Sequence, residues 1–333
     1  MRTVALAVCM AILASCGGDS DPSRSPAPTV EGVAWRRLPP APTARTEVTA
    51  AIARRRIYVS GGFVPSGDTV AVVEVFDTAT RSWSVEPDLP VGVNHAASAG
   101  LDGAVYVLGG YLGPSLGNPT NRAFVLRGAR WVELPPMPEV RAAAGAAALD
   151  GRIYVAGGVG PEGLAEDMLV FDPGAGRWSA EPGPPTAREH LGVTAADGRL
   201  YVVGGRTGGI GTNLAAAEAF DPAAGTWERL PDLPTPRGGI AAAATGNGYV
   251  VAPGGEAEAT FSEAEAFDVR AGRWITLPPL PTARHGLGVA AVGTTVYVIA
   301  GGPEPGFAFS DANEAIDLAP LRRSGDNGGE YAG

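Results

Sequence analysis

Five arginines recur at one position of a repeating pattern, which makes them the first candidates for chemistry. Each follows a Pro-x-x tripeptide and precedes a diglycine by sixteen or seventeen residues. They are Arg45, Arg141, Arg188, Arg237 and Arg284, and the remaining repeat has Val93 instead. A guanidinium group is always charged and its fork geometry matches a carboxylate. If the repeats surround a central channel, arginines at its mouth would therefore suit an acidic ligand. The same repetition also fits a structural role, in which each arginine ties its repeat to a neighbour through carbonyl oxygens or the recurring Glu74, Glu218, Glu265 and Glu314.

All three histidines of the chain lie within two residues of this arginine position. His95, His190 and His285 fall in repeats two, four and six, an alternation that predicts a threefold arrangement around the channel. Histidine is the commonest transition-metal ligand. However, His285 is out of phase with the other two by one residue, which turns a side chain elsewhere on a strand. We therefore expect no metal site and no cofactor, and treat the histidines as candidate ligand-binding or hydrogen-bonding residues.

The elements that position these side chains follow from two markers with one period. The six tryptophans stand 47 to 49 residues apart, and six diglycines stand 47 to 50 residues apart. Repeat four shows short apolar runs at 190–196, 200–203, 216–220 and 227–230, separated by Gly, Asp and Pro, which predicts four strands. Four antiparallel strands at this period are typical of one β-propeller blade. The Ala- and Gly-rich first strand fits the crowded axis, and the tryptophan strand fits the outer rim, where the side chain packs between blades.

The order of motifs within each repeat resembles the Kelch repeat. A diglycine follows a Tyr-Val strand, then comes Phe-Asp, and a tryptophan stands six residues after the Asp, as in Asp221 and Trp227. The resemblance covers about residues 35–318 and implies an all-β fold, a six-bladed Kelch β-propeller. Repeat two departs from it with Leu126-Arg127 in place of Phe-Asp. Because the chain enters at a tryptophan strand and ends without one, we expect the N-terminal strand to join the last blade and close the ring.

The first sixteen residues indicate export. Arg2 precedes an apolar stretch at 4–13, which is too short to span a membrane and is typical of a signal peptide. The sequence Leu-Ala-Ser-Cys at 13–16 resembles the lipobox of bacterial lipoproteins, in which Cys16 is lipidated after cleavage; ordinary secretion with cleavage nearby is the alternative. The expected division is a signal peptide at 1–15, a lipidated Cys and flexible tether at 16–32, the propeller at 33–318 and a disordered tail at 319–333. The resemblance implies an extracytoplasmic, lipid-anchored protein of the bacterial cell envelope, with Gly17 favouring the outer membrane where two membranes are present.

Charge and loop length narrow the function. A net charge of −10 without a basic stripe argues against a nucleic-acid partner. If the strands of each blade are A to D from the axis outwards, the long and dissimilar B–C loops share one face with the D–A connections, and variable loops on a rigid frame usually carry binding. We predict a monomeric, non-enzymatic module that binds a protein or glycan through this face.

An enzyme is the alternative function. Kelch-type copper radical oxidases place Cys, Tyr and His at the metal, and with Cys9 removed and Cys16 lipidated the mature chain would have no free Cys. Bacterial Kelch proteins also include six-bladed sialic acid mutarotases, which use arginine and glutamate near the channel. That analogy leaves a sugar-processing enzyme as the second reading.

Overall fold

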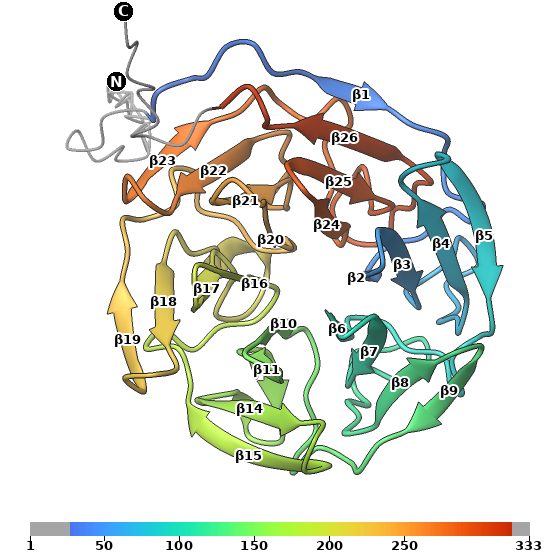
Figure 1. The fold of residues 1–333 in the computed structure, drawn as a ribbon. Coiled ribbons are helices and arrows are strands. Elements are labelled where there is room, and N and C mark those ends of the chain that lie inside the picture. The colour runs from blue at the N-terminus through green and yellow to red at the C-terminus, as the bar shows by residue number, and fades with distance from the viewer. Residues whose placement is uncertain (1–26, 322–333) are drawn as a thin grey trace, which may run out of the picture.

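The computed structural model describes residues 27–321, and nearly all of the regular structure within them is β-strand. Six four-stranded antiparallel sheets stand around one central axis (Figure 1). The single helical element of the described part is a 3₁₀ turn, η1 (Ile210–Thr212). Within residues 27–321, no helix is long and apolar enough to cross a membrane. The all-β, six-bladed propeller predicted from the repeats is confirmed.

The blades are built from strands that follow one another outwards from the axis. Blade one contains β2 (Thr49–Ala53), β3 (Arg56–Ser60), β4 (Val73–Asp77) and β5 (Ser82–Glu86). Blade two contains β6 (Ala97–Leu101), β7 (Ala104–Leu108), β8 (Ala123–Arg127) and β9 (Arg130–Glu133). Blade three contains β10 (Gly145–Leu149), β11 (Arg152–Ala156), β14 (Asp167–Asp172) and β15 (Arg177–Pro182), with a small hairpin, β12 (Val159–Gly160) and β13 (Gly163–Leu164), in its B–C loop.

The second half of the ring repeats this order. Blade four contains β16 (Gly192–Ala196), β17 (Arg199–Val203), β18 (Ala217–Asp221) and β19 (Thr226–Arg229). Blade five contains β20 (Ala243–Ala244), β21 (Tyr249–Pro253), β22 (Ala264–Asp268) and β23 (Arg273–Thr276). Blade six contains β24 (Gly288–Val292), β25 (Thr295–Ile299), β26 (Asn313–Asp317) and, as its outermost strand, β1 (Trp35–Arg37).

The N-terminal strand closes the ring as expected. β1 pairs with β26 in an antiparallel register that sets Trp35 opposite Ile316 and Arg37 opposite Glu314. Figure 1 shows this blue strand lying along the outside of the red C-terminal blade. The closure leaves no blade short of a strand, so the chain supplies the last blade from both of its ends.

Small side chains on the innermost strands let six blades approach one axis. Gly100 on β6 lies so close to β2 of the neighbouring blade that an added Cβ would stand 1.8 Å from the carbonyl oxygen of Ile52. The adjacent inner strands are rich in alanine, and Ala51, Ala99 and Ala147 are all buried. The Ala- and Gly-rich character of the first strand of each repeat is therefore a packing requirement.

Each tryptophan lies on the outermost strand of its blade and joins that blade to the preceding one. Trp227 Nε1 donates to the carbonyl oxygen of Pro182, which ends β15 of blade three, at 2.9 Å. The other five tryptophans donate in the same way, at 2.7 to 2.9 Å, to Pro278, Pro39, Pro87, Pro135 and Pro231. The tryptophan of each repeat thus links two neighbouring blades by a hydrogen bond.

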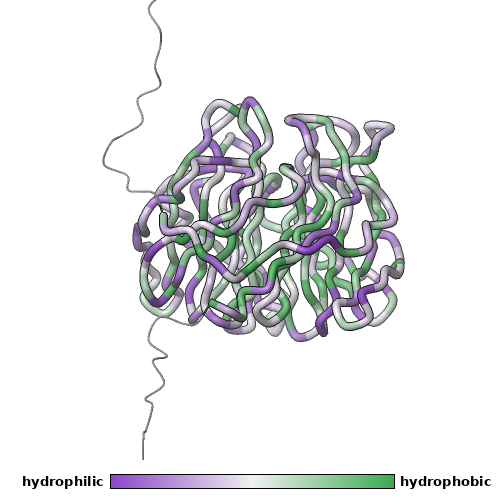
Figure 2. Tube along the Cα trace, turned by 90° about the horizontal axis from the view of Figure 1, so that it is seen from above, coloured by the Kyte–Doolittle hydropathy of each residue, from purple (hydrophilic) through white to green (hydrophobic). Residues whose placement is uncertain are grey.

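The two faces of the ring differ. Tight turns such as Asp197-Gly198, both at positive φ, connect the A and B strands on one face. The B–C loops and D–A connections meet on the other, where Thr46 bridges Phe63 and Glu189 bridges Arg206. In the side view of Figure 2, loops project farther from one face than from the other.

Both ends of the described chain lie against blade five or six. Val30 N–H donates to the carbonyl oxygen of Thr276 on β23, and Asn247 Nδ2 donates to the carbonyl oxygens of Leu318 and Leu321. The contacts of the propeller therefore begin before residue 33 and extend past residue 318. The expected signal peptide, Cys16, most of the expected tether and the tail from residue 322 lie outside the described residues.

Candidate functional site

The five recurring arginines are buried within their own blades. Each is at most 1% exposed. Arg188 shows the arrangement: its guanidinium donates to the carbonyl oxygens of Thr186 and Val202 and to Glu218 Oε2, the last at 2.8 Å. The same pairing joins Arg45 to Glu74, Arg237 to Glu265 and Arg284 to Glu314, whereas Arg141 pairs with Glu139 and Asp167.

The expectation that these arginines ring the channel mouth is therefore wrong, although four of their carboxylate partners are the recurring glutamates named from the sequence. Each guanidinium lies over the second and third strands of its own blade, because the chain turns toward the channel only two residues later. The ties are also within one blade. The link to the neighbouring blade comes from the backbone, where the carbonyl oxygen of Arg188 accepts the N–H of Gly158 at 2.8 Å.

Blade two replaces the ion pair by an apolar pair. Val93 stands at the arginine position. Phe124 of β8 pairs with Val107 of β7, in the place where Glu218 of β18 pairs with Val202 of β17 in blade four. Val93 and Phe124 belong to one buried apolar cluster. The exchange removes both charges together, so neither is left buried without a partner.

Two residues beyond each arginine position, a residue in the left-handed region lines the channel. These six residues are Glu47 (φ 53°), His95 (φ 51°), Ala143 (φ 51°), His190 (φ 53°), Gly239 (φ 69°) and Gly286 (φ 58°). The N–H of each of the last five donates to the carbonyl oxygen of the one before it, at 2.9 to 3.1 Å, and the N–H of Val48 donates to the carbonyl of Gly286 at 3.3 Å. The result is a closed ring of backbone hydrogen bonds through all six blades, which we call the annulus.

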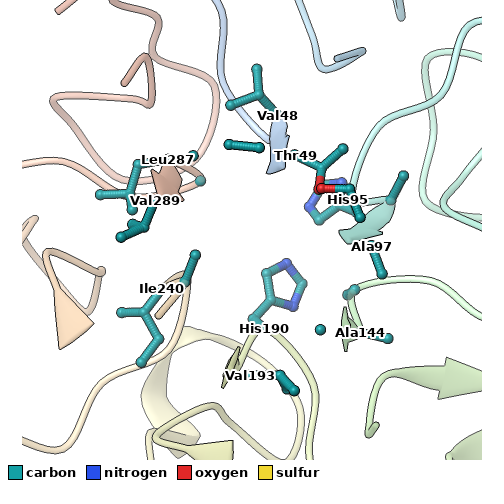
Figure 3. A pocket seen from close by; sticks show the side chains of 18 of the residues that line it. Val48, Thr49, His95, Ala97, Ala144, His190, Val193, Ile240, Leu287 and Val289 are labelled. Atoms are coloured by element: carbon teal, nitrogen blue, oxygen red, sulfur yellow. The ribbon is translucent and has the colours of Figure 1, made fainter. Parts of the chain in front are cut away.

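Three annulus side chains meet at the mouth of the channel. His95 Nε2 lies 3.1 Å from Glu47 Oε2, and the ring centroids of His95 and His190 are 4.9 Å apart. One donor atom from each of Glu47, His95 and His190 lies within 4.8 Å of the other two. Figure 3 shows the His190 ring projecting toward the middle of the channel, on the side of His95, with Ile240 and Leu287 on the opposite wall of the same cavity.

A charged layer surrounds these three side chains. Arg206, the first residue after its diglycine, donates to Glu189 Oε1 at 3.0 Å and to Glu256 Oε1 at 2.9 Å. His285 Nε2 lies 3.5 Å from both Glu47 Oε1 and Glu256 Oε2. His285 therefore contacts the carboxylates of Glu47 and Glu256 from a position one residue before the annulus. The three histidines do not form the expected threefold arrangement.

Burial sets the pKa of His95, and neighbouring charges set that of Glu47. Removal from water lowers the pKa of His95 to about 4, although the Glu47 carboxylate acts in the opposite direction. Burial alone would raise the pKa of Glu47, but the charges of His95, His285, His190 and Arg206 hold it at about 2. At neutral pH the mouth thus presents an ionised Glu47 beside a neutral His95.

Similarity to known proteins agrees with this architecture. The KLHDC2/KLHL20/DRC7 Kelch-repeats domain matches residues 94–302, and the Kelch motif matches residues 44–90. This chain belongs to the Kelch-repeat family. The solved structure of YjhT superposes with a TM-score of 0.73 at 18% sequence identity, over 86% of this chain and 98% of that one. At that identity the likeness shows the fold alone, and no curated protein matches the sequence.

The B–C loops of this Kelch propeller are joined sideways around most of the mouth. Asn213 Nδ2 donates to the carbonyl oxygen of Glu256, and Thr260 Oγ1 donates to that of Pro303, which links the loops of blades four, five and six. Phe307 packs edge-on against Phe63, with ring centroids 5.1 Å apart. The loop of blade one is tied to that of blade two by Thr69 Oγ1, which donates to the carbonyl of Gly113 at 2.6 Å. Five of the six loops therefore form one connected surface.

The sequence located part of this site and missed the rest. His95, His190 and His285 were candidates and are now found in one cluster, but Glu47, Glu189, Arg206 and Glu256 were not named. The sequence does contain one sign of Glu47, which is its position within the repeat. Glu47 stands two residues after Arg45, as His95 does after Val93 and His190 after Arg188. Arg206 and Glu256 share the position directly after a diglycine. Because side chains differ at these positions from blade to blade, a search for identical residues passes over them.

Proposed function

We propose that this Kelch propeller is a lipid-anchored, extracytoplasmic binding module that holds a protein or glycan on its B–C/D–A face. The observation that carries the proposal is the connected surface of five B–C loops. Hydrogen bonds and a ring contact between neighbouring loops fix their relative positions before any ligand arrives. A surface ordered in advance loses less conformational entropy on binding than free loops would.

Exposed apolar side chains support the same face. Among residues 27–321, the large apolar side chains that stand most exposed are Val85 (70%), Phe307 (64%) and Leu116 (51%). Phe307 and Leu116 both lie on B–C loops, whereas Val85 lies on β5 at the outer rim. Aromatic residues that remain exposed on a rigid surface are the usual anchors of a binding interface.

The charge of the mouth indicates what kind of ligand would fit. Glu47, Glu189 and Glu256 face a single guanidinium, that of Arg206, and the five recurring arginines are committed inside their blades. Such a surface suits a neutral glycan stacked on Phe307, or a basic segment of a protein. It suits an acidic sugar less well, because Arg206 already pairs with two carboxylates.

The lipid anchor remains a proposal from the sequence, since Cys16 lies outside the described residues. It rests on the apolar stretch at 4–13 and the Leu-Ala-Ser-Cys sequence that ends in Cys16. Changing Cys16 to Ala should move the protein from the membrane fraction to the soluble fraction. Retention of that variant in the membrane would contradict acylation as the anchor.

A sugar-processing enzyme is the second candidate. The observation in its favour is the buried Glu47–His95 pair, whose shifted pKa values in a cavity are typical of sites that transfer protons. Proton NMR of anomeric mixtures of free sugars, with and without the protein, tests it directly. Faster interconversion of one sugar's anomers, lost in His95→Ala, would favour the enzyme over the binding module.

The binding module is tested by capture on the intact protein. Full-length protein and its Phe307→Ala, Leu116→Ala and Val85→Ala variants are probed against a glycan array and by crosslinking at the cell envelope. We expect the two loop variants to lose at least about tenfold in affinity for whatever the parent binds, and the rim variant to bind normally. Equal binding by all four proteins would place the interaction away from this face.

A further inference from the structure

We propose that Glu47, His95 and His190 bind one divalent transition-metal ion, best matched by Zn²⁺, at the mouth of the channel. The site lies at the mouth that the proposed binding loops surround, but titration with Zn²⁺ alone reads it without the protein or glycan ligand, so failure of one proposal can be told from failure of the other. Its three donors come from blades one, two and four, and each occupies the same structural position of the annulus.

The donor set and its spacing suit such an ion. Two imidazoles and one carboxylate, with a remaining position for water, form a recognised zinc site in proteins. Zinc–ligand distances of about 2.0–2.2 Å place neighbouring donors roughly 3.3 Å apart. Glu47 Oε2 and His95 Nε2 are already 3.1 Å apart. The third donor, on His190, lies within 4.8 Å of both, so it would have to move closer to complete the site.

The hydrogen bonds of Asn94 fix which nitrogen of His95 can coordinate. Asn94 Nδ2 donates to Thr69 Oγ1 and to the carbonyl oxygen of Gly113, at 2.8 and 3.2 Å, which assigns its Oδ1 to the side facing His95. Oδ1 lies 2.6 Å from His95 Nδ1 and can only accept, so Nδ1 carries the hydrogen. Nε2, which lies 3.1 Å from Glu47 Oε2, is then the nitrogen that can coordinate a metal ion. Either a proton or a metal ion between these two atoms would satisfy both.

His190 provides the second, independent sign of a missing partner. Its side chain is 5% exposed and aims into the channel (Figure 3). Nε2 makes no hydrogen bond with any described residue, whereas Nδ1 lies 3.0 Å from Glu189 Oε2. A carboxylate beside the non-coordinating nitrogen is the usual support of a metal-binding histidine. Nε2 is then the nitrogen left to bind the ion.

Backbone conformation points the same way. Blades five and six have glycine in the annulus, which occupies the left-handed region without strain. Glu47, His95 and His190 adopt the same conformation with a long side chain, at a cost of order 1 kcal/mol or more each. The three strained polar residues of the annulus are therefore the same three that can share an ion.

Charge balance completes the argument. The cluster of Glu47, Glu189, Glu256 and Arg206 holds three carboxylates against one guanidinium in a buried setting, an excess of two carboxylates. A dication would neutralise them. Such a compensating charge is what buried carboxylates require.

The test uses the full-length chain without a polyhistidine tag, treated with EDTA and dialysed before Zn²⁺ is titrated by calorimetry. We expect one equivalent to bind, and Co²⁺ in its place to give the visible ligand-field bands of a four- or five-coordinate site. His190→Ala should weaken binding by more than about 100-fold, since even supporting residues contribute 10–100-fold. Ala143 already occupies that position in blade three, so this variant should keep its fold by circular dichroism.

Two further variants and one spectrum make the outcome decisive. Glu47→Gly, which copies Gly239 and Gly286, should also abolish binding, whereas His285→Ala should retain one equivalent. Because the chain has three histidines, a histidine-selective ¹H–¹⁵N spectrum of the unaltered protein should show Zn²⁺ acting on the ring nitrogens of His95 and His190. Substoichiometric binding, unchanged affinity in His190→Ala, or equal loss in His285→Ala would each overturn the assignment.

Discussion

Blade two offers a natural template for replacing the buried ion pair of blade four. Thr186, Arg188 and Glu218 correspond to Val91, Val93 and Phe124, which fill the same space with apolar side chains. Arg188 is fully buried and burial lowers its pKa, so the pair depends on Glu218 to remain charged at tolerable cost. Arg188→Val alone or Glu218→Phe alone should destabilise the protein by about 3–5 kcal/mol, because each leaves one buried charge without its partner.

The triple variant Thr186→Val, Arg188→Val, Glu218→Phe should behave differently. It removes both charges and the Thr186 hydroxyl that donates to Glu218, so its stability should lie within about 2 kcal/mol of the parent. Each kcal/mol corresponds to about 2 °C in melting temperature for a domain of this size, so the single variants should melt roughly 6–10 °C lower. Urea denaturation followed by tryptophan fluorescence, with unchanged m-values, measures the differences. If the triple variant lost the sum of the single losses, the pair would not be the coupled unit inferred here.

Three other perturbations follow from the same structure. In the folded protein the pKa of His95 is lowered to about 4 and that of Glu47 to about 2, so the unfolded chain binds more protons below about pH 6.5. The melting temperature should therefore fall as the pH drops from 6.5 to 4. The melting temperature of His95→Ala should depend less on pH in this range. A parent curve flat over this window would contradict the neutral His95. Trp227→Phe removes one inter-blade hydrogen bond and should cost about 1 kcal/mol in urea, with Trp227→Tyr as a bulk control. Deletion of residues 33–40 removes β1 and should abolish a cooperative melting transition; a sharp transition at the parental temperature would refute the closure.

The fold could be predicted almost completely from the sequence because its constraints repeat. Trp227 and its five equivalents each donate a hydrogen bond to a proline carbonyl of the preceding blade, which fixes the position of the tryptophan within each repeat. Gly100 cannot gain a side chain without meeting the Ile52 carbonyl. The tryptophan requirement recurs in each blade, so it leaves a period in the sequence that spacing alone reveals, whereas at the position of Gly100 the other blades have larger residues, such as Ile52 in blade one.

The site was harder to predict, for two physical reasons. Whether Arg188 faces the channel depends on where the chain turns, and the left-handed turn at His190 is not visible in a pattern of polar and apolar residues. The groups that gather at the mouth, such as Glu47 and Arg206, also come from blades far apart in the sequence. Their meeting is a property of ring closure, and its one sign in the sequence is that such groups recur at the same positions within different repeats.

The annulus has a consequence for how such a protein can change. Its hydrogen bonds use only main-chain atoms, and its six positions already accept Glu, His, Ala and Gly in one ring. Ala143 shows that the ring forms without a polar side chain, whereas a Cβ added at Gly286 would stand 2.6 Å from Glu47 Oε1. Ala143→His would add a functional group there without a new fold, because Ala143 already adopts the left-handed conformation with a side chain. New chemistry at the channel mouth is thus reachable by single substitutions, while the blades that surround it stay as they are.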